Sequence, residues 1–415
     1  MSELHKPNRR DFLRGKAAVD ALADLADSAK VLGDTATTSG EEAALSLSEA
    51  EDTGYLTTFT RRAMACEFAV FLNAGQYPQG TEAALESLDL VEQLESQLTV
   101  FRDTSEIVRI NQTAQTAEVE VEPRLFELLV RAKKIYDATE GAYDIATGKI
   151  TKLWGFYRRQ GNMPDTQGLD AVLQHGGMRN VKLDENRRTV RFLAPDVEFN
   201  LGSIGKGYAL DRMAELLRER GIRDYLLHGG NSSVLARGRK GFGRELSKPS
   251  PHAWWIGLRH PLEPQRRIGE LQLCDRALGT SGSNTQFFIH EGHRYGHILD
   301  PRSGWPAEGM LSTTVAAGTA AEADALATAL YVLGPKKAIE YCRANPNLSA
   351  VLMWPAEESG RVEIALWGLS SEQVRMDMND ASLSITFMRE ANRPALPIFE
   401  IAGKNVLDLP KKPGI

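Results

Sequence analysis

The segment 200–211 places three glycines around one lysine, Lys206, directly before an amphipathic run. The apolar residues of 189–199 alternate as in a strand, so the expected order is strand, glycine-rich turn and helix. Glycines let a backbone approach a ligand closely, and the free N–H groups at a helix start attract anions. Together with the charge of Lys206, this order predicts a binding site for a phosphorylated ligand.

Two familiar phosphate-binding motifs do not describe this segment. A Walker A turn needs four residues between Gly and Gly-Lys and then Ser or Thr, whereas Gly207 follows Lys206 here. The Gly-x-Gly-x-x-Gly fingerprint of dinucleotide-binding folds is absent as well. Taken alone, the segment is equally compatible with a helix entry whose glycines serve close packing and whose lysine is solvated.

The composition is typical of a soluble globular protein rather than of a nucleic-acid-binding or membrane protein. The 415 residues are 42% hydrophobic and 25% charged, which suits one large or two moderate domains. A net charge of -6 argues against broad nucleic-acid binding, and no apolar run is long enough to predict a transmembrane helix. The three scattered cysteines, Cys66, Cys274 and Cys342, predict neither a disulfide framework nor a metal site.

The N-terminal segment leaves the compartment open. Arg9 and Arg10, followed by Asp-Phe-Leu, are typical of a twin-arginine export signal. Three aspartates, however, interrupt the apolar stretch that such a signal needs. A periplasmic or envelope location is expected if the signal works, and a cytoplasmic one otherwise. Residues 1–55 are predicted to form a tail.

Hydrophobic periodicity predicts an α+β fold with mixed sheets. We expect strands at 57–60, 67–72, 225–227, 254–258, 269–273 and 313–316, and helices at 81–98, 124–139 and 320–333. Strands and helices do not alternate steadily, which favours α+β over a doubly wound parallel sheet. Residues 56–360 are predicted to form the main domain, and residues 361–415 a C-terminal appendage.

The predicted helix 320–333 carries a candidate metal site. Asp324 and Thr328 stand four residues apart, so their oxygens lie on one helix face among alanines. Carboxylate and hydroxyl oxygens suit Mg²⁺. The alternative is structural, with the aspartate interacting with the helix dipole and the threonine bonding its own backbone.

Two further segments supply polar groups. Residues 280–282, Thr-Ser-Gly, are expected to form a tight turn after a strand. Residues 297–304 combine the imidazole of His297 with the carboxylate of Asp300, which precedes a proline. Because an imidazole titrates near neutral pH, His297 is a candidate general base, and the alternative is a buried structural histidine.

The ordered motifs resemble the ApbE family, the FAD:protein FMN transferases, over residues 58–341. The matching segments are 105–111, 141–144, 153–156, 200–211, 229–231, 280–282, 297–304 and 323–330. The resemblance implies an ApbE-like, T-fold-like architecture with helices packed around a nucleotide cleft. It implies a Mg²⁺-dependent enzyme that cleaves the pyrophosphate of FAD, attaches FMN to a Thr or Ser hydroxyl of an acceptor flavoprotein and releases AMP.

The resemblance also assigns roles to individual residues. Lys206 is expected to meet the phosphates, and Ser203 (through its carbonyl), Asp324 and Thr328 to bind Mg²⁺. His297, Asp324 and Lys206 form the expected catalytic set. The remaining FAD-binding positions are Met64, Phe101, Ala142, Tyr143, Asp144, Asn200 and Ile298.

The chain departs from the family pattern at two places. Asn200 stands where the family usually has aspartate, and Ala65-Cys66 replace Gly-Thr after Met64. Asparagine keeps the hydrogen-bonding shape of aspartate but loses its charge. Two alternative functions therefore stay open: hydrolysis of FAD to FMN and AMP, and non-catalytic FAD binding.

Overall fold

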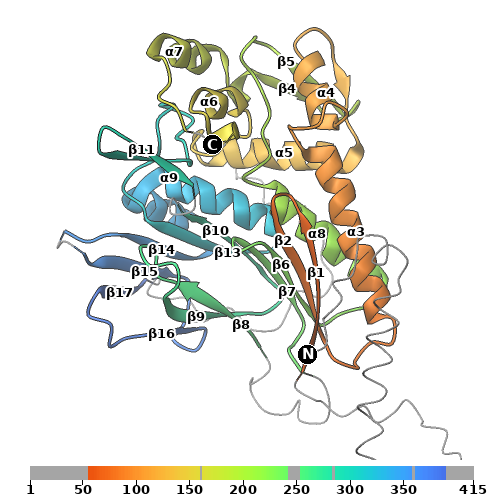
Figure 1. The fold of residues 1–415 in the computed structure, drawn as a ribbon, viewed down its shortest axis with the longest axis vertical. Helices are drawn as coiled ribbons and strands as arrows, with labels where there is room; N and C mark the ends of the chain where they lie inside the picture. Colours follow the sequence, from red (N-terminus) through yellow and green to blue (C-terminus); the bar gives the residue numbers. More distant parts are fainter. Residues whose placement is uncertain (1–54, 159–160, 242–252, 283–285, 358–359, 389–415) are drawn as a thin grey trace, which may run out of the picture. The chain divides into compact units, whose positions relative to one another are not determined.

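A nine-stranded sheet forms the centre of the computed structural model, which describes residues 55–158, 161–241, 253–282, 286–357 and 360–388 (Figure 1). Neighbouring strands run antiparallel except β15 and β17, which are parallel. In spatial order the strands are β1 (Leu56–Ala63), β2 (Cys66–Asn73), β6 (Tyr225–Gly229), β7 (Ser233–Arg237), β10 (Ala277–Gly282), β13 (Ser312–Ala317), β14 (Ser349–Pro355), β15 (Val362–Trp367) and β17 (Leu383–Met388).

Helices cover one face of this sheet: α3 (Gly80–Leu98), α8 (Gly205–Glu219) and α9 (Ala320–Ala344). Buried residues, most of them alanines, line α9 where it meets β10 and β13, including Ala323 and Ala327. The helical conformation breaks at Gly334, whose φ is +75°, before Pro335. The sequence predicts that this helix ends at residue 333, and the break lies directly after that residue. Proline at position 335 cannot continue the helical hydrogen bonding.

A second, three-stranded sheet covers the opposite face of the central sheet. Its order is β16 (Val374–Met376), β9 (Arg267–Leu273) and β8 (Trp254–Arg259). Leu271 and Leu273 of β9 belong to the same buried cluster as Val351 of β14 and Ile364 of β15. Inner strands such as β14 and β15 are therefore buried on both faces and read as nearly continuous apolar runs, whereas the edge strands β1 and β17 are partly exposed.

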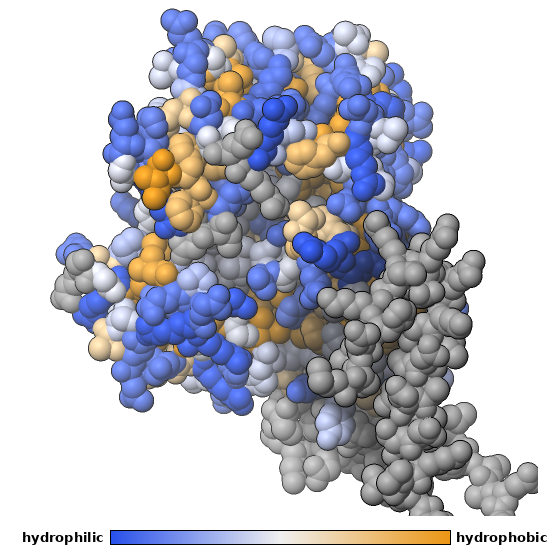
Figure 2. Space-filling model, in the orientation of Figure 1, coloured by the Kyte–Doolittle hydropathy of each residue, from blue (hydrophilic) through white to orange (hydrophobic). Residues whose placement is uncertain are grey.

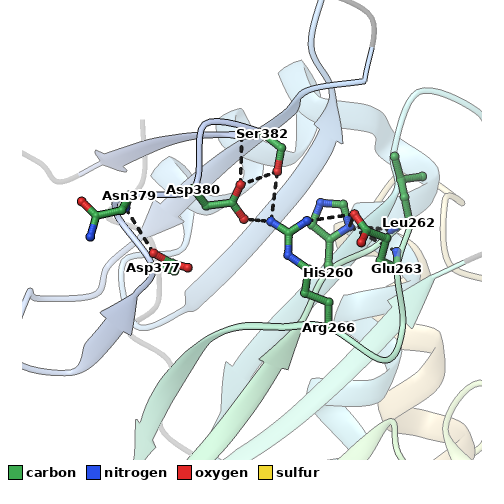
Figure 3. Close-up of polar contacts among 8 residues, drawn as sticks. All are labelled: His260, Leu262, Glu263, Arg266, Asp377, Asn379, Asp380 and Ser382. Carbon is green, nitrogen blue, oxygen red and sulfur yellow. Dashed lines mark hydrogen bonds and ion pairs between the residues drawn. The ribbon is translucent and has the colours of Figure 1, made fainter.

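The predicted C-terminal appendage is wrong for residues 362–388. Strands β15 and β17 complete the central sheet, and β16 joins the second sheet. Figure 3 shows how the turn before β17 is fastened: Arg266, between β8 and β9, donates to the Ser382 hydroxyl at 3.2 Å and forms an ion pair with Asp380. A charge-rich, proline-ended sequence suggests a tail, but the alternating Val, Ile and Leu residues of these strands need a sheet partner.

The upper part of the molecule in Figure 1 is a mixed layer of short elements. It contains α4 (Glu106–Thr113), α5 (Pro123–Ala138), α6 (Gly148–Leu153), α7 (Thr166–His175), the small sheet β3 (Val119–Glu120), β5 (Thr189–Phe192) and β4 (Val181–Asp184), and the hairpin β11 (Phe287–His290) and β12 (His293–Gly296). Trp154 lies fully buried within this layer, with its ring centre 6.2 Å from that of Phe288 in the hairpin. Figure 2 shows a hydrophobic area where Figure 1 places β11, and Ile289 there is 66% exposed.

The α+β prediction and the main strands and helices are confirmed. Two local predictions are wrong. The strand expected over 189–199 ends at Phe192, and residues 280–282 lie inside β10 rather than in a turn, because they pair with β13. The predicted N-terminal tail and export signal fall almost entirely outside the described residues. No helix among the residues described meets the length and hydropathy needed to cross a membrane.

Candidate functional site

The glycine-rich loop enters α8 through a chain of local hydrogen bonds. The Asn200 side-chain oxygen accepts from the Gly202 N–H at 2.9 Å, and the Asn200 N–H donates to the Ile145 carbonyl at 2.7 Å. Leu201 and Ile204 are buried, which anchors the loop to the core on both sides of the exposed Gly202. Helix α8 then begins at Gly205, so Lys206 lies in its first turn, at the positive end of the helix dipole.

Lys206 and Asp324 converge although they come from different helices. The Asp324 carboxylate, in the second turn of α9, accepts a hydrogen bond from the Gly207 N–H at 2.8 Å. The contact is close because Gly207 has no side chain: a Cβ there would lie 2.1 Å from the Ala320 carbonyl oxygen. The lysine ammonium donates to the Ser232 hydroxyl, just before β7. The predicted phosphate loop and the predicted metal-binding carboxylate therefore border one site.

Asp324 is a buried carboxylate whose charge Lys206 compensates only in part. It is 7% exposed, and the Ser233 hydroxyl lies 2.8 Å from both of its oxygens. Burial raises the pKa of Asp324 to about 7, while the positive charge of Lys206 acts in the opposite direction. Burial disfavours the charged form of Asp324, and a cation beside the carboxylate would stabilise that charged form.

The other two expected metal ligands come from different elements: Thr328 lies one turn after Asp324 on α9, and Ser203 lies just before α8. The Thr328 hydroxyl donates to the Asp324 carbonyl at 3.2 Å and lies 3.1 Å from the Ser281 hydroxyl on β10. The Ser203 hydroxyl lies 3.4 Å from that of the buried Tyr143, whose pKa is raised by burial and also by the charge of Asp324. Within the described ranges no cluster of three or more His, Cys, Asp and Glu side chains is poised for a metal. The donors present are one carboxylate and several hydroxyls and carbonyls, a set that suits a hard cation with retained waters.

His297 is held in a defined tautomer. Its Nδ1 lies 3.0 Å from the Gln286 carbonyl oxygen, which only accepts, so Nδ1 carries the proton. Burial lowers the pKa of His297, and the nearby charge of Lys206 lowers it further. The imidazole is therefore neutral at pH 7 and its Nε2 carries a lone pair, as a general base requires. Asp300 does not contribute to this, because its carboxylate pairs with Arg302 at 2.7 Å.

Met64 and Ala65 form a two-residue turn between β1 and β2. Both have positive φ, 48° and 60°, and the flanking Ala63 and Cys66 pair across the turn. Burial raises the pKa of the Cys66 thiol, and the charge of Lys206 opposes that shift, so the turn end of the hairpin lies near the lysine. A turn of this kind favours Gly or Asn, so the chain holds a strained backbone at a predicted FAD contact.

The remaining predicted FAD contacts differ in accessibility. Phe101 is 67% exposed, and its ring centre lies 4.5 Å from that of Tyr157. Ile298 is 9% exposed, whereas the side chains of Ala142 and Tyr143 are fully buried in the core. These roles stay predictions; the exposed ring of Phe101 is suited to stacking on a planar ring.

Asp144 is committed to the protein backbone. Its carboxylate accepts from the Ala146 N–H at 2.6 Å and from the Met178 N–H at 2.9 Å. Burial raises the pKa of Asp144 to about 6. These contacts fix the 142–147 segment against the turn before β4, so the Asp144 side chain holds the backbone of this segment in place.

Sequence reasoning missed the serines that hold the two charged groups. Ser232 bonds Lys206, and Ser233, fully buried, bonds Asp324. They follow the Gly229-Gly230-Asn231 motif, but two serines at the beginning of a strand do not by themselves predict a binding or catalytic role. Only the sheet order, which sets β7 beside β10 under α9, reveals the contacts.

Comparison with known proteins identifies relatives of this chain. The ApbE family profile matches residues 64–352. A FAD:protein FMN transferase of Klebsiella pneumoniae is 31% identical over 280 residues, covering 67% of this chain and 84% of the relative. One from Treponema pallidum is 32% identical over 283 residues, covering 66% and 77%.

Solved structures of similar proteins share the fold. The ApbE protein of Thermotoga maritima superposes with a TM-score of 0.62 at 26% identity, covering 72% of this chain and 94% of that one. The flavinyl transferase ApbE of Pseudomonas stutzeri gives a TM-score of 0.65 at 25% identity, covering 75% and 94%.

Proposed function

Because the chain belongs to the ApbE family, we propose that it transfers FMN from FAD to a Thr or Ser hydroxyl of an acceptor flavoprotein and releases AMP. The acceptor oxygen bonds to the FMN phosphorus, the bridging P–O bond breaks, and AMP leaves with the bridging oxygen. The hydroxyl proton goes to Nε2 of His297. The reaction needs no oxidant or reductant.

The observation that carries this proposal is the position of one ammonium group. Lys206 bonds Ser232, the neighbour of the Ser233 that bonds Asp324. Its charge acts on both the Asp324 carboxylate and the His297 imidazole, so the three groups lie near one another. A phosphate bridge that breaks develops negative charge, which Lys206 and the positive end of the α8 dipole stabilise. His297 stays neutral in this field and is able to take the proton of a weakly nucleophilic hydroxyl.

Mg²⁺ is part of the proposal. The buried Asp324 carboxylate, the Thr328 hydroxyl and the Ser203 carbonyl would hold it, and Ser233 would orient the carboxylate. When bound, the ion supplies charge that neutralises the phosphate oxygens of FAD. The two substrates of the proposed reaction are FAD and an acceptor protein.

Incubation of the purified protein with FAD and Mg²⁺, with and without an acceptor domain, tests the proposal. AMP released only in the presence of the acceptor, together with a covalent flavin on the acceptor, supports transfer. AMP released equally without the acceptor indicates an FAD pyrophosphatase. Intact bound FAD in both reactions indicates a binding protein and overturns the proposal.

A further inference from the structure

The start of α9 is bonded by a carboxylate from α8. The two oxygens of Asp211 accept hydrogen bonds from the Ala320 N–H at 2.7 Å and the Ala321 N–H at 3.0 Å. These are the first two residues of α9, whose N–H groups have no partner within the helix. A negative charge at this end also interacts favourably with the helix dipole.

The same two helices are joined in the opposite direction by Asp324. Asp324 of α9 accepts from the Gly207 N–H in the first turn of α8. Each helix therefore supplies one carboxylate to the start of the other. Asp211 lies one turn beyond Gly207 and Asp324 one turn beyond Ala320, so these three hydrogen bonds join the two helix starts in both directions. Gly207 allows the approach, because any Cβ there would collide with Ala320.

Other side chains secure the start of α9 without connecting it to α8. The Thr319 hydroxyl accepts from the Glu322 N–H at 3.3 Å and from Arg131 of α5 at 2.8 Å. Arg237 of β7 donates to the Gly318 carbonyl at 3.3 Å. These contacts stabilise the turn, whereas Asp211 comes from the helix that also carries Lys206.

We propose that Asp211 is a positioning residue for the metal-binding carboxylate. A helix is stiff and rises 1.5 Å per residue, so fixing Ala320 and Ala321 also fixes Asp324 one turn later. Asp211 thereby sets the separation between Asp324 and the Lys206 end of α8. The inference rests on the proposed function, because it takes Asp324 as a metal ligand, and Asp211 acts through α9, since both of its oxygens are bonded to backbone N–H groups.

The test compares Asp211→Asn with Thr319→Ala. Both variants weaken the start of α9, but only Asp211→Asn removes a hydrogen bond between α9 and α8, because the amide keeps one of the two acceptor oxygens. We expect the Mg²⁺ concentration for half-maximal AMP release to rise about tenfold in Asp211→Asn, the size typical of lost outer-sphere support. Electron paramagnetic resonance of Mn²⁺ in the presence of FAD should show a matching loss of affinity. Thr319→Ala should melt at a lower temperature with metal affinity unchanged.

The outcomes separate the inference from the proposed function. If wild type releases AMP and Asp211→Asn keeps its metal affinity within twofold, the inference is overturned while the function stands. If wild type binds Mn²⁺ but releases no AMP even with an acceptor domain present, the function fails and the Mn²⁺ affinities still judge the inference. If wild type binds no Mn²⁺ with FAD, both fail. Should Asp211→Asn not fold, Asp211→Ser replaces it in the same comparison.

Discussion

The Asp324 carboxylate on α9 accepts a hydrogen bond from the Gly207 backbone N–H on α8, at 2.8 Å, although the two residues are 117 positions apart. This bond joins the predicted metal ligand to the turn that carries Lys206. Burial of the carboxylate favours its neutral form, whereas the Lys206 ammonium and the Ser233 hydroxyl favour its charged form, as a further cation would.

Asp324→Asn should remove metal-dependent turnover while the protein stays folded. The amide keeps the shape and one acceptor for the Gly207 N–H but loses the charge. We expect AMP release to fall by about 10²–10³-fold, as when a transition-state charge partner is lost. Activity should be measured by chromatography of AMP at saturating Mg²⁺. Asp165→Asn, an exposed cap of α7, is the control and should be as active as wild type. Undiminished AMP release from Asp324→Asn would discard the metal assignment.

The same variant makes a stability prediction of known sign. The pKa of Asp324 is raised from 3.8 to about 7, so the folded state binds more protons than the unfolded state between these values. The carboxylate therefore costs stability as pH rises, and this cost is fully present above pH 7. Without metal at pH 8, Asp324→Asn should melt at a higher temperature than wild type. Equal melting temperatures at pH 8 would show that the carboxylate is solvated.

His297→Ala should slow transfer more than it weakens FAD binding. Removing a general base typically costs about 10²–10⁴-fold in rate. Rapid-quench measurement of flavin transfer, beside a fluorescence titration of FAD, separates the two effects. Equal losses in rate and affinity would make His297 a binding residue.

The pH profile gives an independent check on His297. Burial lowers the pKa of this imidazole below 6.5, so the base stays neutral at pH 7 and protonates only in more acidic solution. The transfer rate at saturating Mg²⁺ and FAD should be constant from pH 8 to about 6.5 and fall below that range. His297→Ala should lack this acidic limb. A limb that persists in the variant must belong to another group.

His228 should make stability pH-dependent. Its ring lies 5.2 Å from that of Phe71, its buried Nε2 has no hydrogen-bond partner among the described residues, and burial lowers its pKa. The unfolded chain therefore binds a proton more readily, so stability is intact above pH 6.5 and is lost as pH falls below it. Each unit of pKa shift corresponds to about 1.4 kcal/mol. The free energy of unfolding, measured with urea between pH 5.5 and 8, should depend less steeply on pH in His228→Leu than in wild type. In the control variant His290→Leu, at an exposed position, the pH dependence should equal that of wild type.

Local spacing predicts the parts of the site that lie within one element. Asp324 and Thr328 share a helix turn because the period of a helix is 3.6 residues, and Lys206 lies at a helix start because glycines precede it. The contacts of Ser233 with Asp324, and of Asp211 with Ala320, span 91 and 109 positions. They depend on which strands and helices become neighbours, which composition and periodicity do not encode. For the same reason the strands after residue 361 read as a tail in the sequence.

Ala65→Gly should stabilise the protein. Ala65 is exposed and holds φ at 60° in the turn between β1 and β2, a conformation that costs an L-residue roughly 1–2 kcal/mol. Glycine removes that cost but has roughly 0.5–1 kcal/mol more entropy to lose on folding. We expect a net gain of about 0.5–1 kcal/mol in the free energy of unfolding, measured with urea.

The reverse change, Gly75→Ala, is the control for this turn. Gly75 has a φ of +81°, and a Cβ added there would meet no atom of the described residues within 4 Å. Since the new methyl group collides with nothing, any loss of stability in Gly75→Ala should reflect backbone strain alone. If Ala65→Gly is neutral while Gly75→Ala destabilises, Met64 rather than Ala65 carries the strain of the turn between β1 and β2.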